Sequence, residues 1–429
     1  MVFCDKYSMY IRAMSCRVLL IIVSAVMAVS LAVSCSRGGL DTDVVPRKYA
    51  GRADTPRCRK VLLLYSAGFN DLSSSLEDDI NDMESGYVPR KMTAADVILV
   101  FSRRPADHSY RKNAPSYLYR ISMDVDGNVA RDTLATWPAD SAAASVGTLN
   151  SVLNYVKNKF PAGNYGMVFS SHATGWLPAN DQLVRTPGTI VSPSSVGVDM
   201  TDSNFSYQMD IEDFAAAIPM KLDYLIFDAC LMGGVEVAYA MRDKCDRLLF
   251  SQTETMADGL CDYKTLAQNL FGHDEPGLMK LCEDSYSQYM AQTGLNRSFT
   301  ISMIDCTRLE PLANVCRRIF SDYRTAIASV EPSAVQEYYH TYFTTSARRH
   351  YFYDMDDILE QSGVPSSDMA EFRKALGDCV LYKAATPKFL TLTIRKHCGL
   401  SMYLSANGTY ELDEFYRTLS WNKATEYLK

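Results

Sequence analysis

The sequence predicts an α/β protein whose mostly parallel sheet is covered by helices on both faces. Short apolar runs have the length and composition of buried parallel strands. They cover residues 61–65, 95–101, 166–171, 222–227 and 247–251. Segments with helical periodicity alternate with these runs, and this alternation is typical of such sheets. With 47% hydrophobic and 22% charged residues, the chain has an ordinary globular composition and needs no disulfides to hold its core.

The predicted helices divide the chain into two parts. Between the strands, we expect helices at residues 73–84, 146–160, 210–218 and 233–242. Further along, longer helices are expected at 276–291, 308–328 and 369–385, with single strands at 298–304 and 399–404. We therefore predict an α/β core at residues 60–270 and a helical C-terminal extension, residues 271–429, which packs on the same sheet as part of one domain.

Acidic residues are concentrated in the first predicted helix, at Glu77, Asp78, Asp79, Asp82 and Glu84. They could suggest a metal site, but a solvated helix face is the expected explanation, because carboxylates favour a helix N-terminus. The net charge of the chain is −7. Nucleic-acid binders usually carry a basic surplus, so we expect no nucleic-acid partner.

The N-terminus resembles a bacterial lipoprotein leader. Residues 18–33 are almost continuously apolar and follow two arginines. This apolar stretch is about as long as the core of a signal peptide. It ends in the letters LAVSC, so we expect cleavage before Cys35 and lipidation of its thiol; a plain membrane anchor is the alternative. We predict a signal peptide at 1–34, with Met14 as a candidate true start, and a tether at 35–59. The chain would be exported and anchored to a bacterial membrane, the outer membrane, on a face that the sequence leaves open.

The cysteines point to a single functional thiol rather than to a structural framework. Of the twelve, Cys4, Cys16 and Cys35 lie in or next to the leader. The other nine are scattered singly without CxxC pairs, which is poor evidence for disulfides or a zinc site. We predict no metal ligands, and we expect most of these cysteines to be buried apolar fillers.

Two predicted strands end in reactive residues. One runs into His172 and the other into Cys230. Sites in open α/β sheets form at the carboxyl ends of the strands, so neighbouring strands would bring the two side chains together. A thiol is mostly protonated at neutral pH and needs a base, and His172 can take its proton and return it to a leaving amine. The pair predicts a cysteine hydrolase.

Groups next to this pair suggest how the reaction is supported. Cys230 precedes a predicted helix, whose dipole and the Cys230 N–H could stabilise a thiolate and an oxyanion. A second N–H could come from residues 173–175, at Ala173 or Gly175. Strand periodicity places Asp228 on the face of Cys230, where a carboxylate would favour a cationic substrate side chain. Asp228 could instead cap the following helix, and Asp258 in the next loop could also reach the pocket.

The segments around the two residues are similar to those of the clostripain family of cysteine peptidases. The diagnostic pieces are HATGW from His172 and FDACLMGGVEVA around Cys230. Supporting pieces are AGFNDL at residues 67–72, SQTET at 251–255 and CGLSMY at 398–403. The resemblance covers roughly residues 60–410, and the order and spacing of histidine and cysteine are also similar to those of caspases.

The resemblance implies a caspase-like fold and a Cys–His dyad at Cys230 and His172. It also implies peptide or protein substrates cleaved after Arg or Lys through a thioester, with Asp228 as the acid that favours a basic P1 residue. Family members can cut themselves after a basic residue beyond the histidine. Arg185 is the only basic residue between His172 and Lys221, and an ordinary loop arginine is the alternative. No cofactor is required, and calcium, which some members use, has no readable site.

One difference from the family favours a second reading of the chain. Ala173 stands where the family commonly has glycine, and alanine resists backbone angles that glycine adopts. If the oxyanion donor needs a positive φ there, the chain would be a catalytically impaired surface lipoprotein that uses the fold as a binding module. A serine hydrolase is disfavoured, because the sequence has no Gly-x-Ser-x-Gly elbow.

Overall fold

The computed structural model describes residues 58–92, 95–105, 113–179, 195–200, 206–271, 277–339 and 350–429. The predicted leader, the lipidation site Cys35, nearly all of the tether and the processing site Arg185 lie outside these ranges. In the ranges that are described, no helix combines the length and apolarity needed to cross a membrane.

A nine-stranded sheet forms the centre of the fold, in the order β12-β10-β9-β8-β5-β1-β2-β3-β4. Its five middle strands are parallel. They are β9 (Cys245–Phe250), β8 (Leu222–Asp228), β5 (Ala162–Ser170), β1 (Cys58–Ala67) and β2 (Val97–Arg103). Strand β2 is buried along its whole length, which explains why such strands read as unbroken apolar runs. The predicted parallel sheet is confirmed in this central part.

Antiparallel strands complete both edges, so the whole sheet is mixed. Beyond β2 lie β3 (Ser116–Met123) and β4 (Val129–Trp137), which form a hairpin. Beyond β9 lie β10 (Thr300–Asp305) and β12 (Val380–Ala385), both from the C-terminal part of the chain. The C-terminal part therefore supplies two strands of the sheet itself.

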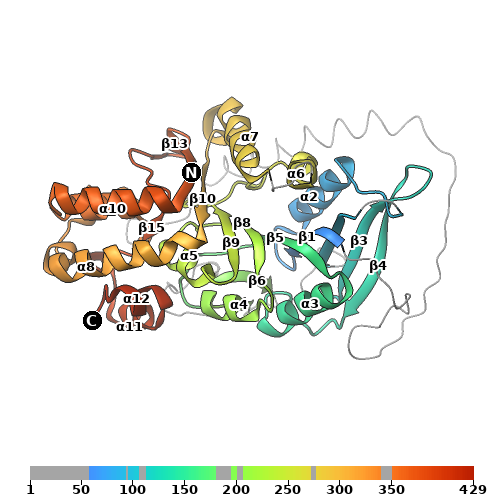
Figure 1. Ribbon diagram of the computed structural model, residues 1–429, viewed down its shortest axis with the longest axis horizontal. Helices are drawn as coiled ribbons and strands as arrows, with labels where there is room; N and C mark the ends of the chain where they lie inside the picture. Colours follow the sequence, from blue (N-terminus) through green and yellow to red (C-terminus); the bar gives the residue numbers. More distant parts are fainter. Residues whose placement is uncertain are drawn as a thin grey trace, which may run out of the picture. The chain divides into compact units, whose positions relative to one another are not determined.

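Helices cover both faces of the sheet, as predicted (Figure 1). One apolar core joins the sheet to α3 (Val146–Lys159), α4 (Ile211–Ala217), α5 (Val235–Met241) and α8 (Leu309–Ala328). A second core, on the other face, joins it to α2 (Ser73–Ser85), α6 (Tyr263–Phe271) and α7 (Leu278–Ala291). Helix α3 begins where the Ser145 side chain accepts a hydrogen bond from Thr148 N, which is a standard N-terminal cap.

The remaining elements mostly belong to the C-terminal part. Helices α9 (Met355–Gln361), α10 (Ser366–Cys379), α11 (Tyr410–Thr418) and α12 (Ser420–Thr425) contribute to the first core. Three two-stranded ribbons pair β6 (Val196–Met200) with β7 (Ser206–Met209), β11 (Tyr353–Asp354) with β15 (Ser401–Met402), and β13 (Lys388–Phe389) with β14 (Leu392–Thr393). Single 3-10 turns occupy Gly294–Asn296, Cys306–Arg308, Pro332–Ala334 and Ser405–Asn407.

The helix predicted at residues 369–385 is wrong in its last six residues. Helix α10 ends at Cys379, and the chain continues directly as β12. Side chains of β12 alternate between partly buried and exposed over its first four residues. Pairing with the free edge of β10 decides the structure of this segment, and such tertiary pairing routinely overrides local propensity.

Candidate active site

The two predicted reactive residues lie at the same edge of the sheet. Strands β5 and β8 are parallel neighbours, and their last matched pair is Ser170 and Asp228. His172 and Cys230 each follow two residues beyond this pair. The topology therefore brings both residues to the carboxyl ends of adjacent strands, where sites form in open α/β sheets.

The loops that carry these residues are packed directly against one another. Gly175, in the loop after His172, has φ +64°, and a Cβ on it would lie 2.6 Å from the carbonyl oxygen of Leu231. Leu231, which follows Cys230, itself has φ +61°, a conformation uncommon for a leucine. Its N–H donates to Thr253 O at 2.9 Å. Glycine is therefore required at position 175 for two reasons, the positive φ and the close approach of Leu231.

Ala173 does not have the backbone conformation that would conflict with an alanine. It is not among the residues with positive φ, and that conformation falls on Gly175 instead. Ala173 bridges to Val196 of β6. The neighbouring hydrogen bonds are Thr174 N to Ser195 O, 2.8 Å, and Gly197 N to His172 O, 3.0 Å. Thus the observation that favoured an impaired binding module no longer supports it.

Asp71 is the hydrogen-bond partner of His172, with Asp71 Oδ1 2.6 Å from His172 Nε2. This bond is the main cause that lowers the pKa of Asp71. Asn70 holds the Asp71 loop by donating to Ala67 O at 3.0 Å and to Val198 O at 2.8 Å. Sequence reasoning did not assign Asp71 to the site, although its position in the loop after β1, the neighbour of β5, could have indicated it.

Cys230 is partly buried, and its sulfur accepts a hydrogen bond from Thr255 N at 3.3 Å. Burial, followed by the negative charge of Glu254, raises its pKa to about 12. Helix α5 begins only at Val235, and dipole stabilisation falls off within a helical turn. The expectation that Cys230 stands directly before a helix is therefore wrong, and its thiol stays protonated at neutral pH until a base removes the proton.

Asp228 is fixed by three hydrogen bonds at the floor of the site and is only 6% exposed. It accepts from Leu260 N and from Tyr263 Oη, both at 2.7 Å, and from Ser170 Oγ at 3.3 Å. Burial raises the pKa of its carboxyl group. Helix α5 is preceded by Gly234 and has no side-chain cap, so the alternative of Asp228 as its cap is wrong.

Two further acids lie near Asp228. Asp258 is exposed on the loop between β9 and α6, next to Gly259, where a Cβ would lie 3.2 Å from Asp228 Oδ2. Asp79 of α2 is partly buried. Burial is the main cause that raises its pKa to about 9, and the negative charges of Asp228, of nearby α2 acids and of Asp258 act in the same direction. The three carboxyl groups therefore form one acidic region around Asp228, in which Asp79 keeps its proton at neutral pH.

The solvated face predicted for the acids of α2 is thus only partly correct. Asp79 belongs to the acidic region around Asp228, whereas three other acids of α2 form ion pairs with basic residues. Glu77 pairs with Arg104 at 2.8 Å, Asp82 with Lys264 at 3.3 Å, and Glu84 with Arg131. Over the described ranges, no three His, Cys, Asp or Glu side chains are grouped as metal ligands.

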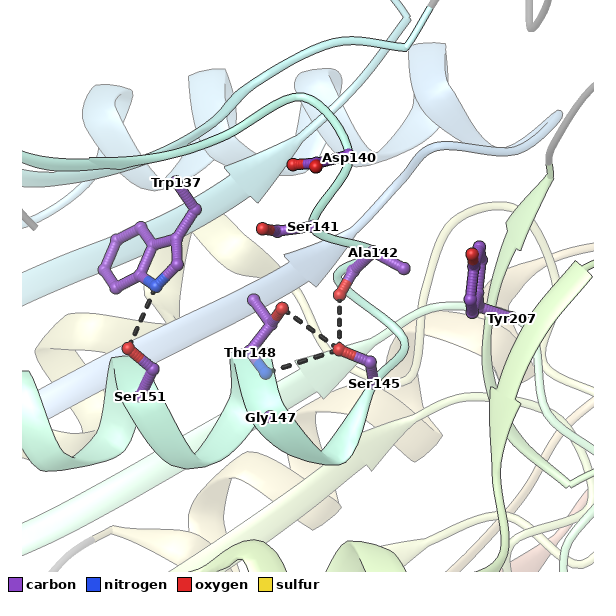
Figure 2. Close-up of a pocket in the computed structure, with 9 residues that line it drawn as sticks. All are labelled: Trp137, Asp140, Ser141, Ala142, Ser145, Gly147, Thr148, Ser151 and Tyr207. Atoms are coloured by element: carbon purple, nitrogen blue, oxygen red, sulfur yellow. Dashed lines mark hydrogen bonds between the residues drawn. The ribbon is translucent and has the colours of Figure 1, made fainter. Parts of the chain in front are cut away.

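A separate hollow of about 330 Å³ lies at the start of α3, between Trp137 and Tyr207 (Figure 2). Its polar groups bond one another: Ser145 Oγ donates to Ala142 O at 2.8 Å, and Trp137 Nε1 donates to Ser151 Oγ at 3.1 Å. Neither Cys230 nor His172 lines it.

A sequence profile of the clostripain family, peptidase family C11, matches residues 64–427. The match covers nearly all of the chain beyond its N-terminal segment. The chain belongs to the clostripain family of cysteine peptidases. The family profile and the caspase-like fold agree with the resemblance seen in the segments around His172 and Cys230.

Individual relatives are distant. Clostripain from Hathewaya histolytica is 25% identical over 209 residues, which cover 46% of this chain and 38% of that protein. The chain therefore spans well under two thirds of the length of this curated relative. An inactive zymogen of a C11 protease from Parabacteroides distasonis superposes with a TM-score of 0.71 and 26% identity, over 87% of this chain and 99% of the other. A secreted C11 cysteine protease from Bacteroides thetaiotaomicron, iotapain, superposes with a TM-score of 0.70 and 24% identity, over 86% of this chain and 100% of the other. This similarity shows the shared fold.

Proposed function

We propose that this clostripain-family chain is an endopeptidase that cleaves after Arg or Lys, with Cys230 as nucleophile and His172 as base. The observation that carries the proposal is the pairing of β5 with β8. It places the thiol and the imidazole at adjacent strand ends, next to the acidic region formed by Asp228, Asp258 and Asp79. Peptide and protein chains with a basic P1 residue are the substrates that this combination favours.

In the proposed mechanism, His172 takes the proton of the Cys230 thiol as the sulfur attacks the scissile carbonyl carbon. Asp71 already bonds Nε2, so Nδ1 receives the proton and Asp71 orients the ring. Backbone N–H groups of Cys230 and of Ala173 or Gly175 stabilise the oxyanion. The C–N bond then breaks, and the leaving amine takes the proton from His172.

The remaining thioester is hydrolysed in a second step. Water attacks its carbonyl carbon while His172 removes a proton from the water. The C–S bond breaks, the new carboxyl end of the substrate leaves, and the proton returns to the Cys230 sulfur. All proposed steps use groups of this chain.

The acidic region explains the proposed preference for a basic side chain. A buried carboxylate at the end of a pocket attracts a cation strongly because water screens the interaction poorly there. Asp228 is the buried member and Asp258 the exposed one. A guanidinium or ammonium group between them would offset charges that otherwise repel one another.

A panel of aminomethylcoumarin peptides with P1 Arg, Lys, Leu or Asp tests this function on the full chain in mild detergent. We expect release from the Arg and Lys peptides, and release from the Leu and Asp peptides lower by about 100-fold or more. Equal, negligible release from all four peptides would contradict the peptidase proposal. Equal, rapid release would contradict only the proposed specificity.

We also propose that the chain matures by cutting itself after Arg185. The support comes from the sequence alone, in which Arg185 is the only basic residue between His172 and Lys221. The Arg185→Ala variant should then remain a single band on a denaturing gel where the parent chain gives two, and Cys230→Ala should also stay intact. An unchanged band pattern in Arg185→Ala would rule out this site.

We further propose that the chain is exported and anchored to the outer membrane through a lipid on Cys35. The leader and the residues before Cys35 support this proposal. Cells fed a labelled fatty acid should incorporate the label into the parent chain and not into Cys35→Ser. Equal labelling of both would contradict lipidation at Cys35, and a chain that stays membrane-bound without label would point to a plain membrane anchor.

A further inference from the structure

Three buried polar groups without a hydrogen-bond partner lie close together beneath the catalytic loops. They are Trp176 Nε1, Glu236 Oε2 and Ser401 Oγ. Trp176 and Glu236 are 1% exposed, and Ser401 is fully buried. Buried polar groups are nearly always bonded to protein or to ordered water, so three such atoms in one place need an explanation.

The three groups converge on the side-chain position that Gly234 leaves empty. A Cβ on Gly234 would lie 2.8 Å from Glu236 Oε2, 3.6 Å from Ser401 Oγ and 3.7 Å from Trp176 Cδ1, the ring atom bonded to Nε1. A donor, an acceptor and a hydroxyl that can serve as either therefore surround one small space. Internal water molecules typically make about three such hydrogen bonds.

We propose that one internal water molecule binds Trp176 Nε1, Glu236 Oε2 and Ser401 Oγ, and that Glu236 is through it a positioning residue of the peptidase. The water accepts a hydrogen bond from the indole N–H and donates one to the carboxyl oxygen. It makes a third hydrogen bond with the serine hydroxyl. The inference rests on the proposed peptidase function, because it concerns the geometry of the same two loops.

The contacts of these residues join three segments of the active site. Trp176 belongs to the loop after His172, whose Gly175 packs against Leu231 of the Cys230 loop. Gly233, in the Cys230 loop, accepts a hydrogen bond from Ser401 N at 2.8 Å. The water would thus fix the histidine loop, the cysteine loop and strand β15 against one another.

Glu236 is itself held firmly from the C-terminal part of the chain. Its Oε1 accepts from Tyr403 N and from Tyr416 Oη, both at 2.8 Å, which leaves Oε2 to face the proposed water. Burial raises the pKa of Glu236 to about 7. Water suits both protonation states, because it can donate to the carboxylate and accept from the acid.

The chain offers a matched control for the indole contact. Trp421 on α12 is also fully buried, and its Nε1 also lacks a partner. Its ring contacts are with Tyr239 of α5 and Phe320 of α8. Replacing either tryptophan by phenylalanine removes a buried N–H that has no partner within the protein, together with part of the ring, so both variants should lose similar thermal stability.

The activity of these variants on an Arg peptide, with the full chain, tests the positioning role. We expect Trp176→Phe to lower kcat by about tenfold with KM within twofold, because a misplaced catalytic loop slows chemistry more than binding. Trp421→Phe should leave kcat within twofold. Glu236→Gln, which keeps the shape and hydrogen-bonding capacity of the side chain, should retain kcat, and Glu236→Leu should lose it by about tenfold or more.

Equal kcat changes in Trp176→Phe and Trp421→Phe would overturn the positioning role while leaving the peptidase function intact. An inactive parent chain would instead contradict the proposed function. In that case a crystal structure of the full chain decides the inference, since the water must appear within hydrogen-bond distance of all three atoms. Absence of that water would overturn the inference whatever the activity.

Discussion

Cys230→Ala should abolish cleavage of Arg and Lys peptides and lower kcat/KM by about 10⁴-fold or more, because loss of a covalent nucleophile removes the whole thioester route. Cys230 is partly exposed at the carboxyl edge of the sheet, whereas the other free cysteines whose side chains are described are buried. The measurement is initial coumarin release by the purified full chain at saturating and subsaturating peptide.

Cys316→Ala provides the control for this variant. Cys316 is fully buried in α8. Its loss should lower the melting temperature, because a large-to-small change leaves a cavity, and should leave kcat/KM nearly unchanged. If Cys230→Ala keeps more than a tenth of the parent activity, another group is the nucleophile.

Asp228→Asn should lower kcat/KM for Arg and Lys peptides by about 100-fold, because the cation would lose a desolvated negative charge. The Oδ1 of asparagine can still accept from Leu260 N, and its amide N–H₂, in place of Oδ2, can donate to Tyr263 Oη, so Leu260 and Tyr263 should keep their places. The activity on a Leu peptide, measured beside the Arg peptide, separates specificity from general damage.

The three acids provide an internal comparison for this prediction. Asp258→Asn should lower kcat/KM for the Arg peptide by a smaller factor, about tenfold, because Asp258 is exposed and its charge is screened by water. Asp79→Asn should change kcat/KM least at neutral pH, because burial and the charges of nearby acids raise the pKa of Asp79 to about 9 and asparagine resembles the neutral acid. Equal losses on Arg and Leu peptides in Asp228→Asn would show that Asp228 supports the loop and does not select the substrate.

Much of the site could be predicted because its parts follow simple rules. Buried parallel strands read as apolar runs, and the two runs that end at His172 and Cys230 are neighbours in the sheet. The strand-end rule then places both residues at one edge. The edge strand β12 could not be predicted in the same way, because pairing with β10, rather than a local signal, determines its structure.

The acids of the site show where sequence reasoning is limited. Asp79 belongs to a run of helical acids that periodicity assigns to the surface, and only the packing of α2 beside the site turns it toward Asp228. Asp71 reaches His172 through a loop whose path depends on hydrogen bonds from Asn70. The packing that turns Asp79 carries no signature in a single sequence, whereas the place of Asp71 in the loop after β1, a neighbour of β5, is a signal that the sequence does contain.

The most direct test of the account is covalent labelling of the full chain with a peptidyl acyloxymethyl ketone that carries P1 Arg, followed by intact mass measurement and peptide mapping. The account predicts one adduct per chain, on Cys230, with loss of the carboxylate leaving group. It also predicts much slower labelling by the P1 Leu and P1 Asp analogues and none in Cys230→Ala. An adduct on another cysteine would contradict the proposed nucleophile. Equal labelling by all three reagents would contradict the proposed basic specificity.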